Sequence, residues 1–173
     1  ITPSNLSNVI VEEAQSKIEK ACQKLGLTNG PIHAEFKIAN DEVFLIEINP
    51  RMIGGLCSRC LSFGLFKQSL EELILLSFST GNFKQIELLS NYVGVLMLPV
   101  PKSGKFRSIN HEEIINIENV SSVDITVSKN SSINMPPNGE RYLGFVFSQG
   151  ENKLVVMQAL KKALKIAEPI IDS

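Results

Sequence analysis

The sequence predicts an α+β fold, and three features of its 173 residues support this prediction. Apolar residues recur at helical spacing before residue 26, two alternating runs flank a short turn between residues 32 and 49, and short strands precede an amphipathic segment after residue 151. A spacing of three or four residues is typical of a helix, and strict alternation is typical of a strand. We therefore predict two domains, residues 1–90 and residues 91–173.

The first predicted element is a helix that ends near residue 25. Asn5 or Ser7 can cap its N-terminus, and Gly26 is a typical stop signal. Apolar residues recur along it at helical spacing: Ile10, Ala14, Ile18, Ala21 and Leu25.

The next segment predicts a β-hairpin. Residues 32–38 and 43–49 alternate between apolar and polar side chains, and the turn-forming residues 40–42 lie between them. A register with Glu35 opposite Glu47 gives one wholly apolar face: Ile32, Ala34, Phe36, Ile38, Phe44, Ile46, Ile48 and Pro50. The other face then holds His33, Glu35, Lys37, Leu45, Glu47 and Asn49. Arg51 would continue in the same direction, so burial of the apolar face brings two carboxylates together.

This polar face is a candidate metal site. Two adjacent carboxylates repel each other unless a proton or a cation lies between them. Hard oxygen ligands suit Mg²⁺, which takes its remaining ligands from water and substrate phosphates. Asn49 can add a carbonyl oxygen, Arg51 is suited to bind phosphate or carboxylate, and His33 is expected to be a hydrogen-bonding neighbour rather than a ligand. The alternative is an exposed sheet face with solvated Glu and Lys, which the matched apolar face disfavours.

Residues 54–59 form a candidate substrate site. Gly54 and Gly55 would let backbone amides approach an anion, and a helix expected to begin near Cys57 would point its N-terminus there. Ser58 and Arg59 would line the pocket, and a plain loop leading into a surface helix is the alternative. A further apolar helix is expected over residues 69–78, ending at Gly81.

Residues 91–173 predict a small antiparallel sheet backed by a helix. Strands are expected over residues 91–101, 105–109, 122–128 and 142–148, with a turn at 136–139. A short helix over residues 111–117 would be capped by Asn110. The last helix, residues 151–166, would bury one stripe: Leu154, Met157, Leu160 and Leu164.

Composition excludes some functions. A net charge of −1 gives no electrostatic case for nucleic-acid binding, and the longest apolar run, residues 92–100, is too short to span a membrane. Three cysteines are ordinary for a reducing compartment, so we expect a cytoplasmic protein. Cys57 and Cys60 form a C-x-x-C pattern, for which packing is favoured over a redox or zinc role because no second cysteine pair follows.

The residues of the hairpin resemble a known family. Glu35, the run Glu47-Ile48-Asn49-Pro50-Arg51 and the two glycines that follow are similar to the late metal-binding segment of ATP-grasp enzymes, in the branch with biotin carboxylase and amino-acid ligases. The resemblance implies that Glu35, Glu47 and Asn49 bind Mg²⁺ (or Mn²⁺) held by ATP, and that Arg51 contacts the transferred phosphate. It also implies the C-terminal half of an ATP-grasp fold (an antiparallel sheet with flanking helices), followed by a small α+β domain. Residues 143–147 are the part of this domain that most resembles the family.

The implied activity is that of an ATP-dependent carboxylate–amine ligase, which forms a C–N bond through an acyl-phosphate. ATP, a small carboxylate and an amine would be its partners. The sequence begins with Ile1 and has no glycine-rich phosphate loop, so we expect a C-terminal fragment, inactive alone, that needs the N-terminal part of the same enzyme. A homodimer is compatible with this.

Other functions stay open beside that of a ligase. A biotin carboxylase itself is less expected, because an apolar strand, residues 93–98, stands where that family has Cys-Arg-Ile. The alternatives to a ligase are a non-catalytic metal- or nucleotide-binding module and a protein-interaction domain.

Overall fold

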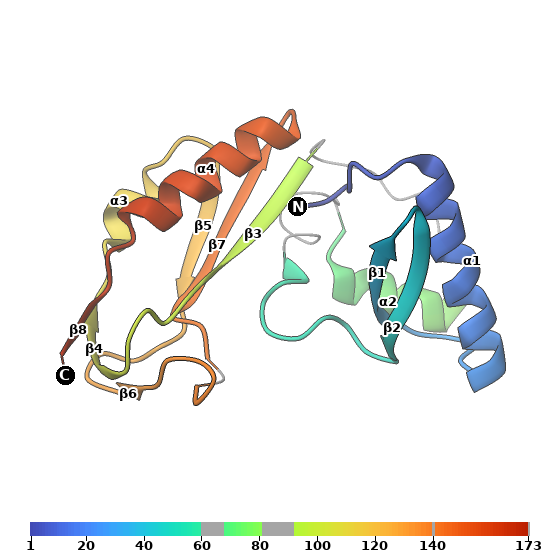
Figure 1. Cartoon of the computed structure of the whole chain (residues 1–173), viewed down its shortest axis with the longest axis horizontal. Helices are drawn as coiled ribbons and strands as arrows, with labels where there is room; N and C mark the ends of the chain where they lie inside the picture. The colour runs from blue at the N-terminus through green and yellow to red at the C-terminus, as the bar shows by residue number, and fades with distance from the viewer. Residues whose placement is uncertain (60–67, 81–91, 140, 173) are drawn as a thin grey trace. The chain divides into compact units, whose positions relative to one another are not determined.

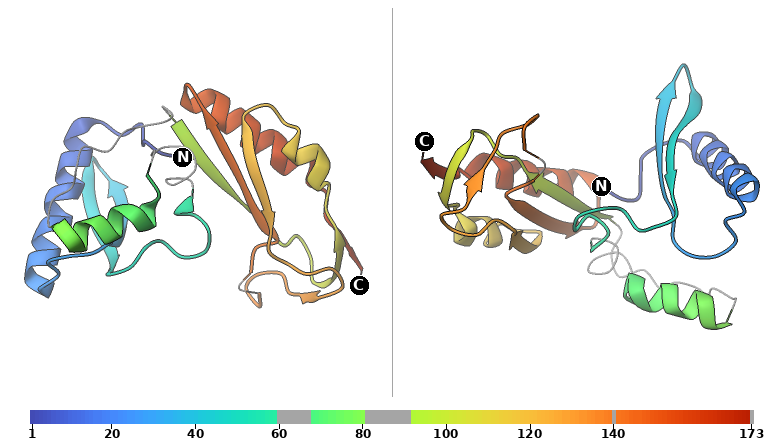
Figure 2. Two further views of the ribbon diagram at one scale, coloured as in Figure 1. Left: turned by 180° about the vertical axis from the view of Figure 1, so that it is seen from behind. Right: turned by 90° about the horizontal axis from the view of Figure 1, so that it is seen from below.

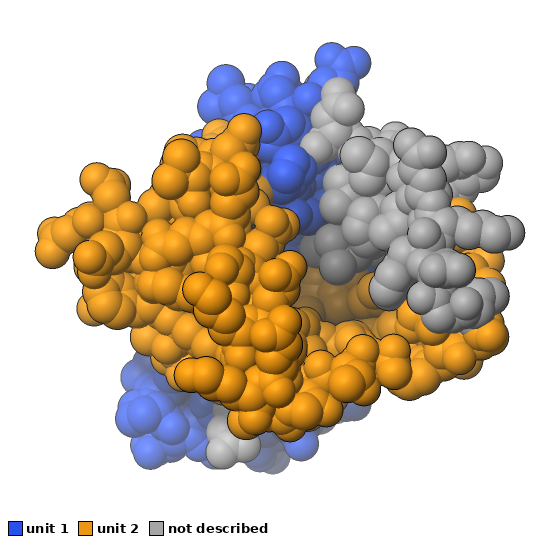
Figure 3. Space-filling view, turned by 90° about the vertical axis from the view of Figure 1, so that its right-hand side faces the viewer, with its two compact units in different colours: residues 1–3, 59–67, 88–173 blue, residues 4–58, 68–87 orange. Residues whose placement is uncertain are grey.

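The computed structural model describes residues 1–59, 68–80, 92–139 and 141–172. Its helices and strands are shown in Figure 1 and, from two other directions, in Figure 2. The chain divides into two compact units, coloured in Figure 3: unit 1 comprises residues 1–3, 59–67 and 88–173, and unit 2 comprises residues 4–58 and 68–87. Residues 1–3 belong to unit 1 because Thr2 pairs with Val93. The predicted α+β fold is confirmed, and the domain limits at residues 90 and 91 stay a prediction.

Unit 2 begins with helix α1, Asn8–Leu25. Of the two predicted caps, Ser7 is the N-cap, and its hydroxyl accepts a bond from the Ile10 amide at 3.4 Å. Gly26 ends the helix in the left-handed conformation, with φ of 69°, and its amide bonds to carbonyls of the last turn. The predicted helix and both of its limits are confirmed.

Strands β1, His33–Ala39, and β2, Glu42–Asn49, form the predicted antiparallel hairpin. Asn40 and Asp41 form the turn with φ of 51° and 60°, as a two-residue hairpin turn requires. The register is as predicted from His33 to Glu35, where Glu35 pairs with Glu47. The register shifts between Glu35 and Phe36, which then pairs with Leu45.

This shift overturns part of the predicted apolar face. One extra residue in β2, Ile46, changes which side chains of β2 face the side of Phe36. Val43 is therefore buried at 1% exposure, whereas Phe44 and Ile46, both predicted to be buried, are 46% and 62% exposed.

Helix α1 lies along the hairpin beside β2 (Figure 1). The Glu13 carboxylate accepts a bond from the Val43 amide at 3.3 Å, and the Lys17 ammonium donates to the Val43 carbonyl. Glu13 and Lys17 also form an ion pair of 2.7 Å. Together these two side chains bond to the backbone of β2. Without them, the Val43 amide and carbonyl would be free to pair with another strand.

Helix α2, Leu70–Thr80, completes the described part of unit 2 and confirms the helix predicted over residues 69–78. The Ser69 hydroxyl accepts a bond from the Glu72 amide at 3.0 Å at its start. Leu73 is buried, whereas Leu75, Leu76 and Phe78 are exposed. The predicted stop at Gly81 lies outside the described residues, as does most of the helix predicted near Cys57.

The described residues of unit 1 form two three-stranded antiparallel sheets. The larger has the order β3 (Tyr92–Leu98), β7 (Gly144–Gly150), β5 (Val120–Ile125), and helix α4, Lys153–Ile166, packs on β3 and β7. The smaller has the order β6 (Ser132–Ile133), β4 (Gly104–Ser108), β8 (Ile170–Asp172). The predicted sheet backed by a helix is confirmed (Figure 2), and neither β6 nor β8 was predicted.

The buried face of α4 differs from the predicted stripe. Its buried residues are Val156, Ala159, Leu160 and Ala163. Leu154 and Leu164, predicted to be buried, are 57% and 46% exposed. A Cβ on Gly94 would lie 2.8 Å from Val156, so the absence of a side chain on β3 allows the helix to pack this closely.

Helix α3, His111–Ile115, forms as predicted but without the predicted cap. The side-chain amide nitrogen of Asn110 instead donates to the Ile166 carbonyl at 2.9 Å, and this bond connects α3 to the end of α4. Within the described ranges, no helix combines the length and apolar character that crossing a bilayer requires.

Candidate functional site

Glu35 and Glu47 are direct partners across the hairpin of unit 2, and both side chains are exposed. Directly opposite residues of an antiparallel pair have Cβ atoms about 5 Å apart and share a face of the sheet. The register shift follows this pair immediately, and such irregularities commonly direct side chains at functional sites. The structure therefore brings the two predicted carboxylates together.

Each carboxylate has a polar neighbour two residues away on its own strand. The Asn49 side-chain amide donates to Glu47 Oε1. The His33 Nε2 atom lies 3.7 Å from Glu35 Oε1. Since His33 and Asn49 are themselves partners across the strands, all four side chains belong to one face of the hairpin.

The chemistry of this face fits a hard divalent cation. Two carboxylates and an amide oxygen are ligands that Mg²⁺ accepts, and their exposure leaves room for water and phosphate ligands. In the part of the chain that the structure describes, no group of three or more His, Cys, Asp and Glu residues is placed to hold a metal by itself. The predicted ligand set, Glu35, Glu47 and Asn49, differs from such a group because one of its three members is an amide.

Arg51 lies beyond the end of β2 rather than along the polar face. Its amide bonds to the Asn49 carbonyl at 2.8 Å, which turns the chain at Pro50. Its guanidinium donates to the Met52 carbonyl at 2.9 Å and is exposed. The predicted continuation of the strand direction to Arg51 is therefore wrong, because the strand ends at Asn49.

The residues of the predicted substrate site divide between the units. Gly54, Gly55 and Ser58 belong to unit 2, and Gly55 has φ of 65°. Arg59 belongs to unit 1, where it forms an ion pair of 2.6 Å with Asp124 and lies 5.8 Å from the centre of the Phe147 ring. These contacts give Arg59 a structural role, and its role in substrate binding stays a prediction.

Cys57 is partly buried, and burial raises the pKa of its thiol. A thiol with a raised pKa is mostly protonated at neutral pH and is a poor nucleophile. The raised pKa of Cys57 therefore weighs against a redox role for the C-x-x-C pattern. The second cysteine of this pattern lies outside the described residues.

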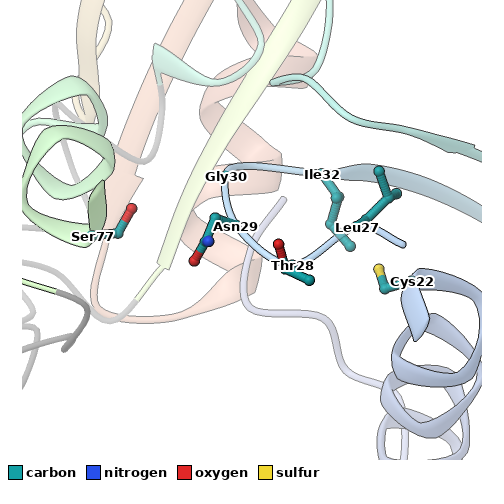
Figure 4. Close-up of a pocket in the computed structure, with 7 residues that line it drawn as sticks. All are labelled: Cys22, Leu27, Thr28, Asn29, Gly30, Ile32 and Ser77. Carbon is teal, nitrogen blue, oxygen red and sulfur yellow. The ribbon is translucent and has the colours of Figure 1, made fainter. Parts of the chain in front are cut away.

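A cavity of about 240 Å³ lies in unit 2 between the loop after α1 and helix α2 (Figure 4). It is lined by Cys22, Leu27, Thr28, Asn29, Gly30, Ile32 and Ser77. None of the predicted site residues is among them, so this cavity is separate from the carboxylate face.

Comparison with protein families now relates this geometry to known proteins. Residues 1–60, which include the whole hairpin, match the family described as the ATP-grasp domain. This part of the chain is similar to the ATP-grasp domain. A comparison with curated protein sequences finds no match.

Solved structures extend the ATP-grasp likeness to the rest of the chain. The chain is similar to L-amino acid ligase from Bacillus licheniformis, with a TM-score of 0.86, 20% identity, and coverage of 99% of this chain and 43% of that protein. N5-carboxyaminoimidazole ribonucleotide synthetase from Thermotoga maritima gives a TM-score of 0.75 at 18% identity, covering 99% and 45%. Biotin carboxylase from Campylobacter jejuni gives 0.66 at 16% identity, covering 98% and 38%. The chain thus has a partial ATP-grasp fold and spans less than half the length of these proteins.

Sequence reasoning missed two features of residues 1–60. The first is the attachment of β2 to α1 through Glu13 and Lys17, which an i, i+4 pair of opposite charges could have indicated. The second is the register shift beside Glu35, for which the alternating pattern of β2 carries no signal.

Proposed function

We propose that the chain is part of an ATP-dependent carboxylate–amine ligase and that Glu35, Glu47 and Asn49 hold Mg²⁺ together with the phosphates of ATP. The pairing of Glu35 with Glu47 across the hairpin, with Asn49 beside it, carries this proposal. Two observations support it: residues 1–60 match the ATP-grasp domain, and similar structures are named as a ligase and a synthetase.

The metal would neutralise phosphate charge and align the terminal phosphate of ATP. Asn49 donates to Glu47 through its amide nitrogen, which leaves its carbonyl oxygen available as a third ligand. The two carboxylates, whose mutual repulsion the cation relieves, would fix the position of the phosphates relative to the hairpin.

The proposed reaction has two steps. A substrate carboxylate oxygen attacks the terminal phosphorus of ATP, a new O–P bond forms, and the bond to ADP breaks, which gives an acyl-phosphate. The amine nitrogen then attacks the acyl carbon, the C–N bond forms, phosphate leaves, and the nitrogen loses a proton to water. Arg51 would release the Met52 carbonyl and bond to the oxygens of the transferred phosphate, where a fixed positive charge favours the transition state.

Binding of Mn²⁺ in the presence of ATP, followed by electron paramagnetic resonance, tests the metal site. Glu47→Gln and Glu35→Gln should each weaken Mn²⁺ binding by at least about tenfold, since removal of an outer-shell partner alone costs about 10–100-fold. Glu42→Gln is the matched control, because Glu42 lies on the same strand opposite Ala39, at the other end of the hairpin. Unchanged Mn²⁺ affinity in both Glu35→Gln and Glu47→Gln would overturn the proposal.

Turnover distinguishes a ligase from a metal- or nucleotide-binding module. The intact protein that contains this chain should form ADP at a rate that depends on both a carboxylate and an amine. Metal binding without any such dependent ADP formation would favour the binding module.

A further inference from the structure

We propose that His33 is a positioning residue that holds the Glu35 carboxylate in place for the metal by donating a hydrogen bond from Nε2. This inference rests on the proposed function, because it concerns the same metal site. His33 would not itself bind Mg²⁺, which prefers oxygen ligands.

The two side chains differ in freedom. The His33 side chain is 18% exposed, whereas the Glu35 side chain is 54% exposed. The imidazole is therefore mostly buried and has little room to move, whereas the carboxylate is largely free to rotate. The distance of 3.7 Å between His33 Nε2 and Glu35 Oε1 is less than about 1 Å longer than the usual length of a hydrogen bond. A rotation within the Glu35 side chain can close this gap.

The surroundings of the second ring nitrogen indicate which nitrogen carries the proton. His33 Nδ1 is buried and has no hydrogen-bond partner among the residues that the structure describes. A neutral imidazole has one N–H donor and one acceptor nitrogen. Among backbone groups, buried N–H donors without a partner are rarer than under-satisfied acceptors, and the cost of burying an unpaired donor applies to a ring N–H as well. The proton is therefore favoured on Nε2, the nitrogen that faces Glu35.

The other carboxylate of the pair has an equivalent arrangement. Asn49, the cross-strand partner of His33, donates to Glu47 Oε1. A donor two residues away on the same strand would thus hold one oxygen of each carboxylate and leave the other oxygen for the cation. Outer-shell donors of this kind orient metal ligands, and their loss typically costs about 10–100-fold in metal affinity or activity.

Three variants test this role by Mn²⁺ affinity in the presence of ATP. His33→Leu replaces the imidazole with an apolar side chain that has no hydrogen-bond donor, and should weaken Mn²⁺ binding by about 10–100-fold. His33→Gln keeps an amide N–H near the position of Nε2 and should bind Mn²⁺ within a few-fold of the wild-type chain. His111→Leu, at a histidine of unit 1 that the proposal does not use, is the matched control and should leave the affinity unchanged.

The outcomes separate this inference from the proposed function. Equal affinities for His33→Leu and wild type, or an equal loss for His33→Leu and His33→Gln, would overturn the positioning role while the losses in Glu35→Gln and Glu47→Gln leave the metal site intact. No effect of either Glu substitution would overturn both proposals.

The tautomer of His33 in the wild-type chain gives a readout that does not depend on any variant folding. Nitrogen-15 NMR of the imidazole should show the proton of the neutral ring on Nε2. A neutral ring with its proton on Nδ1 would overturn the proposal, because Nε2 could then only accept.

Discussion

The two units bury their apolar side chains to different extents. Among the described residues, the buried apolar side chains of unit 2 are Ile10, Val43 and Leu73. Most of those of unit 1 form one cluster that includes residues of α3 and α4 and extends from Leu98 to Ile171, and Val93, Phe145 and Phe147 are buried outside this cluster. Unit 2 instead leaves several large apolar side chains more than 60% exposed: Val9, Leu25, Ile46, Leu75 and Phe78.

The large buried core and most of the candidate site residues therefore belong to different units. Unit 1 has a closed core and carries few of the predicted site residues, whereas the two-stranded hairpin of unit 2 carries Glu35, Glu47 and Asn49. A two-stranded hairpin is marginally stable by itself. We therefore expect the contacts of β2 with α1 at Val43 to stabilise the proposed metal-binding face within unit 2.

The largest expected effect is the loss of a buried aromatic side chain in unit 1. Phe147 is 2% exposed, and Phe147→Ala should lower the free energy of unfolding of unit 1 by about 3–5 kcal/mol. Both tyrosines, Tyr92 and Tyr142, belong to unit 1, and the sequence has no tryptophan. Tyrosine fluorescence during urea unfolding therefore reports on unit 1.

The matched control is the same substitution at an exposed site of unit 2. Phe78 is 63% exposed, so Phe78→Ala should change the free energy of unfolding by less than about 1 kcal/mol. Equal losses from Phe147→Ala and Phe78→Ala would contradict the contrast between the units.

A smaller effect tests the register of the hairpin. Val43 is 1% exposed, and Val43→Ala should destabilise unit 2 by about 2 kcal/mol, since each buried methylene contributes about 0.8 kcal/mol and a small cavity remains. Ile46→Ala should change stability by less than about 0.5 kcal/mol, because Ile46 is 62% exposed. Amide hydrogen exchange of the hairpin measures both. The reverse order would favour the unshifted register, in which Ile46 is buried.

The features that the sequence predicts well are local. Ser7, Gly26 and the turn at Asn40 and Asp41 each act on neighbouring backbone groups, so their residue types alone indicate the helix limits and the hairpin. The sequence predicts the pairing of Glu35 with Glu47 through the apolar face that this register creates, and the structure has this pair. The turn alone would place Ile46 opposite Glu35, because it pairs Ala39 with Glu42, so the pair also depends on the extra residue in β2, which the sequence does not indicate.

The features that it predicts poorly depend on distant contacts. The sequence predicts a buried stripe on α4 that includes Leu154 and Leu160, and the structure buries Leu160 but not Leu154. The close approach of the helix to Gly94 adds Val156 to the buried face. Arg59 and Asp124 are 65 positions apart, and no pattern in the sequence links them. Strand β8 has three residues, too few for any periodicity.

The ion pair between Arg59 and Asp124 should contribute little to the stability of unit 1. Their side chains are 38% and 36% exposed, and pairs of this kind contribute about 0–1 kcal/mol because water screens them. Asp124→Asn should lower the free energy of unfolding by at most about 1 kcal/mol in low salt, and by less at about 1 M salt, where the Debye length is about 3 Å. A loss equal to that of Phe147→Ala would show that the pair is a principal stabilising contact.

The smallest expected effect is a pH dependence of the attachment of β2 to α1. The hydrogen bond from Lys17, followed by that from the Val43 amide, lowers the pKa of Glu13. A carboxyl group whose pKa is lower in the folded chain stabilises it fully above the pKa of the unfolded chain, about 4.3, and this contribution is lost as the pH falls through the folded pKa. Protection of the Val43 amide from hydrogen exchange should therefore be greater in the wild type than in Glu13→Gln at neutral pH.

The pH at which this difference disappears is the decisive observation. As the pH falls through the lowered pKa, Glu13 becomes protonated, and the wild type should approach the exchange protection of Glu13→Gln. Glu12→Gln, at an exposed position of the same helix, is the control and should follow the wild type throughout. A difference between wild type and Glu13→Gln that persists unchanged to low pH would mean that Glu13 holds β2 by packing rather than by its charge.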